Sequence, residues 1–287
     1  MNAPLTNALA CARCGSFGDG GFETYNACKS CIGTVLPRDV RGAPSLTTNA
    51  RGVLFLFRQV GAPSLLLMLG AYAIIAGVQV FAHSQGLEDK QVENIGKLFA
   101  FIPFWATLVI MVRAHHVFQG VAAGFSDALR LASDRFLPAL WTSFVMAFFT
   151  MCWTMLLVLP GVYKHFTYSL STPVTLFEMR SGNVAVTESK RRTKPEDWTI
   201  VLIGVAVALG GGSLQFFFAL LVALALVGLD PSADALPFVL LTQAFTGSFV
   251  AVVQAFSTMV FYEQTLVRRL EERTEEDEFL DAMKPSF

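Results

Sequence analysis

The sequence predicts an all-α polytopic membrane protein, with about six transmembrane helices, interfacial helices and a small zinc ribbon at its N-terminus. Three observations support the membrane part of this prediction. Of the 287 residues, 54% are hydrophobic, only 15% are charged, and the charge is missing from a few long stretches. Because a soluble domain carries about a quarter charged residues, the composition excludes a disordered chain, a coiled coil and a disulfide-rich secreted scaffold.

A helix needs about 20 apolar residues to cross the ~30 Å hydrocarbon core of a bilayer. Six stretches meet or approach this length, at residues 63–81, 98–117, 138–159, 161–176, 199–229 and 236–262. The fourth is the weakest, since it contains Lys164, His165 and Pro173. We still expect six crossings, or five and a deep re-entrant hairpin, because of the distribution of charge along the chain.

Lysine and arginine gather on the cytoplasmic side of membrane proteins. With the N-terminus inside and six crossings, all 21 Lys and Arg residues fall on or just inside the cytoplasmic face except Lys90, Lys97 and Lys164. This pattern predicts cytoplasmic N- and C-termini. The domain at 51–262 then holds the six helices, and an acidic tail follows at 263–287.

Four cysteines near the N-terminus form a pattern typical of a zinc ribbon. Two Cys-x2-Cys pairs, separated by 13 residues, comprise Cys11, Cys14, Cys28 and Cys31. Four thiolates suit tetrahedral Zn²⁺ and leave no position for water, so we expect a structural zinc and not a catalytic one. Reduced cytosol disfavours disulfides; a redox pair or unmetallated cysteines are the alternatives. This module covers 1–36, and a linker covers 37–50.

Three polar or amphipathic segments, at 51–62, 124–138 and 182–198, each precede a pair of expected spans. This arrangement suggests three repeats of an interfacial helix followed by two spans. In the third segment we expect Glu188 and the basic run 190–192 to face the headgroups. His115 and His116 end the second span and are expected to anchor it at the interface. The glycines at 210–212 favour close helix packing, with an interrupted span as the alternative.

Several short motifs resemble a known family. They are Pro160-Gly161 followed by Val162-Tyr163, a segment at 173–178 that ends in Glu178, and the spacing Gly182, Ala185, Ser189. The stretch 50–270 is similar to the membrane domain found in front of some bacterial glycerophosphodiester phosphodiesterases, which has stand-alone six-helix relatives. The resemblance implies a six-helix fold in the bacterial inner (cytoplasmic) membrane. It implies no activity, because the phosphodiesterase domain is absent and the cysteine module is extra.

The residues that could carry chemistry are few. We find no acidic residue inside a span, which disfavours proton-coupled transport, and no paired carboxylates, nucleophile triad, phosphate loop or open metal site. We therefore predict a non-enzymatic accessory or scaffolding protein, surrounded by membrane lipids, whose zinc ribbon or acidic tail docks a cytoplasmic protein. No nucleic-acid partner is expected, because the charges of residues 1–50 nearly balance, and an oligomer is compatible with this prediction.

The alternative is a transporter or lipid-handling membrane protein. Its ligand path would be marked by polar residues that lie within or next to the spans, namely Lys164, His165, Gln215 and Gln243. Glutamine side chains in membrane helices usually hydrogen-bond between helices. If the protein is a transporter, alanine replacement of these four residues should impair transport, and normal transport in the variants would exclude the alternative.

Overall fold

The computed structural model describes residues 44–118, 124–194, 197–229 and 236–282, and every regular element in these ranges is a helix. The elements are α2 (Leu46–Leu56), the π-helical η2 (Phe57–Gly61), α3 (Ala62–Ser84), α4 (Asp89–Leu98), α5 (Phe101–Phe118), α6 (Phe125–Asp134), α7 (Phe136–Leu156), α8 (Val158–Thr167), α9 (Ser171–Glu178), α10 (Gly182–Thr193), α11 (Asp197–Leu229) and α12 (Leu236–Ala282). The all-helical character is confirmed. The predicted zinc ribbon lies outside the described residues.

Within the described residues, five helical stretches are long and apolar enough to cross a membrane, which gives the chain the character of a multi-pass membrane protein. They are Leu46–Ser84, Lys90–Phe118, Phe136–Leu156, Trp198–Phe218 and Val239–Arg268. The stretch 161–176, expected as the fourth span, is not one helix, because α8 ends at Thr167 and α9 begins at Ser171. Pro173 lacks an N–H group and therefore suits the first turn of a new helix. Neither α8 nor α9 is longer than about 15 Å, which is half the thickness of the hydrocarbon core of a bilayer.

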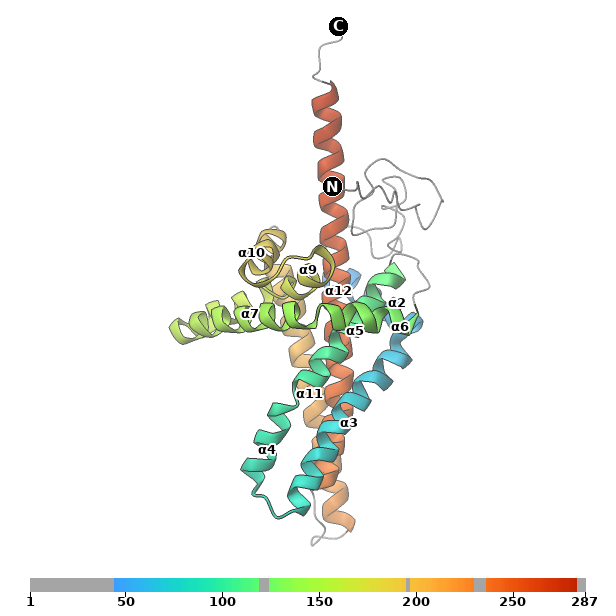
Figure 1. The fold of residues 1–287 in the computed structure, drawn as a ribbon, viewed down its shortest axis with the longest axis vertical. Coiled ribbons are helices and arrows are strands. Elements are labelled where there is room, and N and C mark those ends of the chain that lie inside the picture. The colour runs from blue at the N-terminus through green and yellow to red at the C-terminus, as the bar shows by residue number, and fades with distance from the viewer. Residues whose placement is uncertain (1–43, 119–123, 195–196, 230–235, 283–287) are drawn as a thin grey trace, which may run out of the picture.

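Four helices run along the long axis of the molecule and pack on one another: α3, α5, α11 and α12 (Figure 1). The 47-residue α12 extends well beyond the other three at its C-terminal end. In contrast, α7 runs crosswise to this bundle, and α9 and α10 lie next to it on the side toward the C-terminal end of α12. The arrangement therefore combines an axial bundle with a lateral layer made of α7 to α10.

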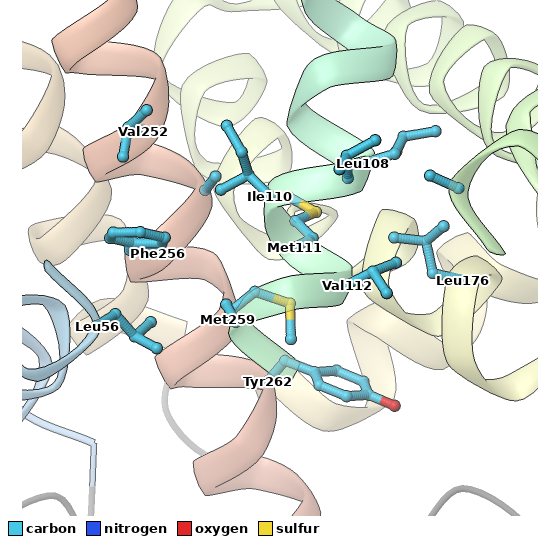
Figure 2. Packing of buried hydrophobic residues seen from close by; sticks show 14 of the residues in the cluster. Leu56, Leu108, Ile110, Met111, Val112, Leu176, Val252, Phe256, Met259 and Tyr262 are labelled. Carbon is cyan, nitrogen blue, oxygen red and sulfur yellow. The ribbon is translucent and has the colours of Figure 1, made fainter. Parts of the chain in front are cut away.

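The core lies where α12 meets α5 and α2. Figure 2 shows Met259 and Tyr262 of α12 directed toward α5, whereas Phe256 lies on the same side of α12 as Leu56 of α2. These four side chains are fully buried. Two further bonds fasten α2 to α12, because the Asn49 amide donates to the backbone oxygen of Ser257 at 3.1 Å and accepts from the Ser257 hydroxyl at 2.8 Å. The axial bundle is thus held by apolar contact and by buried hydrogen bonds.

The three expected interfacial segments differ in the structure. The 124–138 segment contains α6, a short helix that buries Ala128 and Ala132. The 51–62 segment is not a separate helix, because α2, η2 and α3 continue without a break from Leu46 to Ser84. The third segment forms α10, but its Glu188 and Arg192 do not face headgroups, since both side chains are buried. The predicted threefold repeat therefore does not describe the first unit.

The glycines at 210–212 lie within an uninterrupted helix, α11. A Cβ atom at Gly211 would lie 2.9 Å from the side chain of Val250 on α12, whereas Gly210 and Gly212 have open space. Gly211 therefore allows α11 to approach α12 closely, as the packing interpretation predicts. The alternative of an interrupted span is not seen.

Candidate ligand site in the membrane domain

A large open cavity lies between α3, α4, α11 and α12. Its volume is about 620 Å³, and its polar lining comprises Tyr72 and Gln79 of α3, Glu93 and Lys97 of α4, Gln215 of α11, and Gln243 and Gln254 of α12. The structure thus brings two of the predicted ligand-path residues, Gln215 and Gln243, to one cavity. Within the described part of the chain, Gln215, Gln243 and Gln254 have no hydrogen-bond partner. Their amides therefore remain able to bind a ligand or water.

The edge of this cavity is shaped by a glycine on α4. A Cβ atom at Gly96 would lie within clashing distance of the Gln79 amide, so only glycine lets that side chain approach α4 this closely. The Gln79 amide donates a long hydrogen bond of 3.5 Å to the backbone oxygen of Val92. On the same helix Glu93 and Lys97 form an exposed ion pair at 2.7 Å. Charge is therefore confined to the rim of the cavity, and the interior lining is neutral.

A second, more enclosed cavity of about 250 Å³ lies between α8, α11 and α12. Its polar lining comprises His165, Ser169, Gln254, Ser257 and Thr258. Burial lowers the pKa of His165 below its usual value of 6.5, so the imidazole is neutral near pH 7. A neutral imidazole offers one hydrogen-bond donor and one acceptor. The third predicted ligand-path residue therefore lies in a different cavity from the two glutamines.

The two cavities share the residues Val250 and Gln254 of α12. The α12 residues that line them are spaced by three or four positions, from Gln243 through Gly247, Val250 and Gln254 to Thr258. This spacing places them on one face of the helix. One face of α12 therefore connects the amide-lined cavity to the imidazole-lined one.

The fourth predicted ligand-path residue, Lys164, lies apart from both of these cavities. Its ammonium nitrogen lies over three aromatic rings, those of Trp153, Tyr163 and Tyr168, at 5.6, 5.3 and 5.9 Å from the ring centroids. Aromatic rings attract cations through their negative faces. Lys164 is therefore held among aromatic side chains of α7, α8 and the turn that follows α8, and it does not line the path that the sequence suggested.

A buried ionic cluster, which we define as Glu178, Glu188, Arg192 and Tyr262, joins the lateral layer to α12. The Arg192 guanidinium donates to Glu178 at 2.6 Å and to Glu188 at 3.0 Å. The Tyr262 hydroxyl donates to the other oxygen of Glu178 at 2.9 Å. Burial alone would lower the pKa of Arg192, but the two carboxylates outweigh it and raise this pKa. The guanidinium is therefore permanently charged.

A second buried pair lies next to this cluster. His115 Nδ1 of α5 lies 2.5 Å from a carboxylate oxygen of Glu263 on α12, and both side chains are buried. The His115 ring also stacks on Phe177 at a centroid distance of 4.0 Å. His115 is thus not an interfacial anchor, and Glu263 is an acidic residue inside a candidate span. The sequence analysis missed the His115–Glu263 pair, because its two residues lie far apart in the chain. It also missed the ion pair of Glu188 and Arg192, although their i, i+4 spacing on one helix is typical of such a pair.

The predicted zinc ligands lie outside the described residues, so their coordination stays a prediction. Within the described ranges, no group of three or more His, Cys, Asp or Glu side chains has the geometry of a metal site. No protein-family model, curated protein sequence or solved structure matches the chain. The resemblance to the phosphodiesterase-associated membrane domain therefore rests on its short motifs alone.

The structure gives those motif residues packing roles. Gly182 adopts a positive φ of 58° and lies against the Trp141 indole. Its N–H group donates to the Thr142 hydroxyl at 2.8 Å. Ser189 is buried and donates to the backbone oxygen of Thr167 at 2.9 Å. Gly182 and Ser189 thus hold α10 against α7 and α8. Neither they nor the third residue of the motif, Ala185, lines either cavity.

Proposed function

We propose that this chain is a non-enzymatic membrane protein that binds an amphiphilic molecule, such as a membrane lipid, in its larger cavity. The observation that carries the proposal is the set of three unpaired amides, Gln215, Gln243 and Gln254, around an open space of about 620 Å³. All three residues are exposed on the helices that line this open space, and an amide at membrane depth is costly unless it finds a hydrogen-bond partner. The ester, hydroxyl or amide groups of a lipid would supply one.

The electrostatics of the cavity favour such a ligand over an ion. Its interior is lined by neutral groups, and its only charged side chains, Glu93 and Lys97, already pair with each other at the rim. Transport pathways for ions and protons are normally marked by embedded charge. A ligand with a neutral polar group and an apolar body fits this lining better, which supports lipid handling over ion transport.

The test is to purify the protein from its native membranes in mild detergent and identify the retained lipids by mass spectrometry. The variant is Gln215→Leu with Gln243→Leu, which removes two amides with little change in volume. The control is Gln59→Leu, because Gln59 is exposed on η2 and lies away from both cavities. We expect one lipid class to be retained by the wild type and the control and lost from the variant. An identical lipid profile in all three would overturn the proposal.

A second proposal concerns the four N-terminal cysteines. Their spacing favours a structural Zn²⁺ ribbon that docks a protein partner in the cytoplasm. The distribution of Lys and Arg favours a membrane domain in the bacterial inner membrane with both termini on its cytoplasmic side. Metal analysis of the purified chain tests the ribbon, and Cys11→Ser with Cys14→Ser should abolish bound zinc. Loss of a protein partner in this variant, with the lipid profile unchanged, would separate the docking role from lipid handling. Zinc-free wild-type protein would overturn the ribbon.

A further inference from the structure

The hairpin formed by α7 and α8 carries a long uncovered apolar surface. All residues from 151 to 159 are exposed, and Met155 and Leu159 expose 73% and 82% of their surfaces. Leu157, in an extended conformation, joins the two helices. Gly161 allows the close return, because a Cβ atom there would clash with Thr154. Nine consecutive exposed residues of this kind require an apolar cover.

The base of the hairpin is fixed to the lateral layer by buried hydrogen bonds. The Thr142 hydroxyl of α7 accepts from the N–H group of Gly182 at 2.8 Å and from the Thr175 hydroxyl at 2.9 Å. Both partners belong to helices that lie beside α7, at the end of the bundle from which α12 extends (Figure 1). The crosswise direction of α7 is therefore set by specific contacts at its base, and its distal half points away from the bundle.

We propose that α7 and α8 do not cross the bilayer but lie within one leaflet, parallel to the membrane plane, with acyl chains as the partner of their exposed apolar surface. A helix that is apolar all round must be covered on every side. For α7, the helices α8, α9 and α10 cover one side, and the acyl chains cover the rest. On α10, the exposed side chains of Lys190 and Arg191 are then available to the headgroups and water.

The charge distribution supports this arrangement over six crossings. If only α3, α5, α11 and α12 cross, every Lys and Arg of the chain lies on or just inside the cytoplasmic face except Lys90 and Lys97. Lys164, which is an outer residue in the six-span topology, moves to the inner side with the rest. Its three aromatic neighbours are of the types that gather at membrane interfaces. The inner leaflet is therefore the one that α7 and α8 occupy.

Depth-dependent fluorescence quenching tests the inference directly. In a background with the four N-terminal cysteines changed to Ser, the native Cys152 of α7 is labelled with a fluorophore in vesicles containing lipids brominated at defined depths. Single cysteines on the same helix face follow, from Phe144→Cys, Phe148→Cys and Met155→Cys in the Cys152→Ser chain. We expect all four labels to be quenched most strongly at one shared depth in one leaflet. A crossing α7 would instead shift that depth by about 16 Å between 144 and 155.

The matched control is α3, which runs along the bundle axis. Leu66→Cys and Ile74→Cys replace exposed apolar residues of α3 and should differ in depth by about 12 Å. A membrane-impermeant thiol reagent gives a second readout. In the proposed arrangement Leu157→Cys does not react from the outer side, whereas Lys90→Cys does. Reaction of Leu157→Cys from outside would overturn the inference.

The quenching experiment also distinguishes lipid from a second copy of the chain as the cover of the hairpin. Absence of quenching at all four positions, with close label-to-label approach between copies, would mean that a second copy of the chain covers the hairpin, and would overturn the inference. If the cysteine-to-serine background does not fold, a fluorescent non-natural side chain at Phe144 and Met155 of the otherwise native chain gives the same depth comparison. The lipid-retention test of the cavity is independent, because it involves no residue of α7.

Discussion

The buried ionic cluster and the amide-lined cavity both contain polar side chains beside apolar helices, but they differ in charge and in pairing. In the cluster, Arg192 contacts two carboxylates at 2.6 and 3.0 Å. In the cavity, the interior groups are neutral, and three amides have no partner among the described residues. The difference indicates that the charged groups hold helices together, whereas the neutral groups are available for a ligand.

The comparison predicts that damage to the cluster mainly affects stability. We expect Arg192→Met to have the largest effect of any change discussed, because it removes the buried cation that lies between the carboxylates of Glu178 and Glu188. Glu188 then keeps only its contacts with the more exposed Arg180 and Arg191. Such a loss costs about 3–5 kcal/mol. Thermal unfolding in detergent, followed by circular dichroism, measures it.

The matched control for this prediction is Arg191→Met. Arg191 also contacts Glu188, at 3.2 Å, but 63% of its side chain is exposed, so its loss should cost less than about 1 kcal/mol. The triple variant Arg192→Met, Glu178→Gln, Glu188→Gln should regain most of the lost stability, because it removes the two carboxylate charges together with their buried cation. Equal destabilisation by the Arg191 and Arg192 variants would contradict the role of burial.

A smaller effect is expected at the joint between α7 and α10. Gly182→Ala places a Cβ atom 2.8 Å from the Trp141 indole nitrogen in a residue with φ of 58°, so it should destabilise the fold by about 1–3 kcal/mol. Gly70→Ala on α3 has nothing within 4 Å of the new atom and should be neutral or stabilising by up to about 1 kcal/mol. Parallel unfolding curves test the pair, and similar midpoints would argue against strain at Gly182.

The long apolar helices were predictable because a membrane span is a local property, set by about 20 apolar residues in a row. The expected span at 161–176 was wrong, since this stretch forms two short helices. The crosswise direction of α7 was not predictable, because hydropathy shows that a stretch is apolar but not how its helix is oriented relative to its neighbours. Burial of Glu188 and Arg192 also escaped the sequence, because it depends on how α9 and α10 fold onto Tyr262 of α12. The shared cavity of Gln215 and Gln243 is a tertiary feature too, although their polarity within apolar stretches had singled them out.

The cavity side of the comparison predicts loss of binding without loss of stability. Gln254→Leu removes an amide with no partner in the described residues, so we expect unfolding to change by less than about 1 kcal/mol. Retention of the bound lipid should fall, because Gln254 lines both cavities. Mass spectrometry of the purified variant measures retention. A strongly destabilised Gln254→Leu chain would mean that the amide is structural glue, and the distinction between the two regions would fail.

The smallest expected effect is a pH dependence that comes from the second cavity. Burial lowers the pKa of His165 from its usual 6.5, so the folded state binds this proton less readily than the unfolded state. The stability contributed by the neutral imidazole is therefore fully present above about pH 6.5 and is lost as the pH falls toward the lower folded pKa. Comparing unfolding midpoints of the wild type and His165→Gln between pH 7.5 and 5.5, a range chosen to bracket about 6.5, should show a steeper acid loss in the wild type. Identical slopes would mean that the imidazole is well hydrated, and the second cavity would then be an open, water-filled one that differs little from the first.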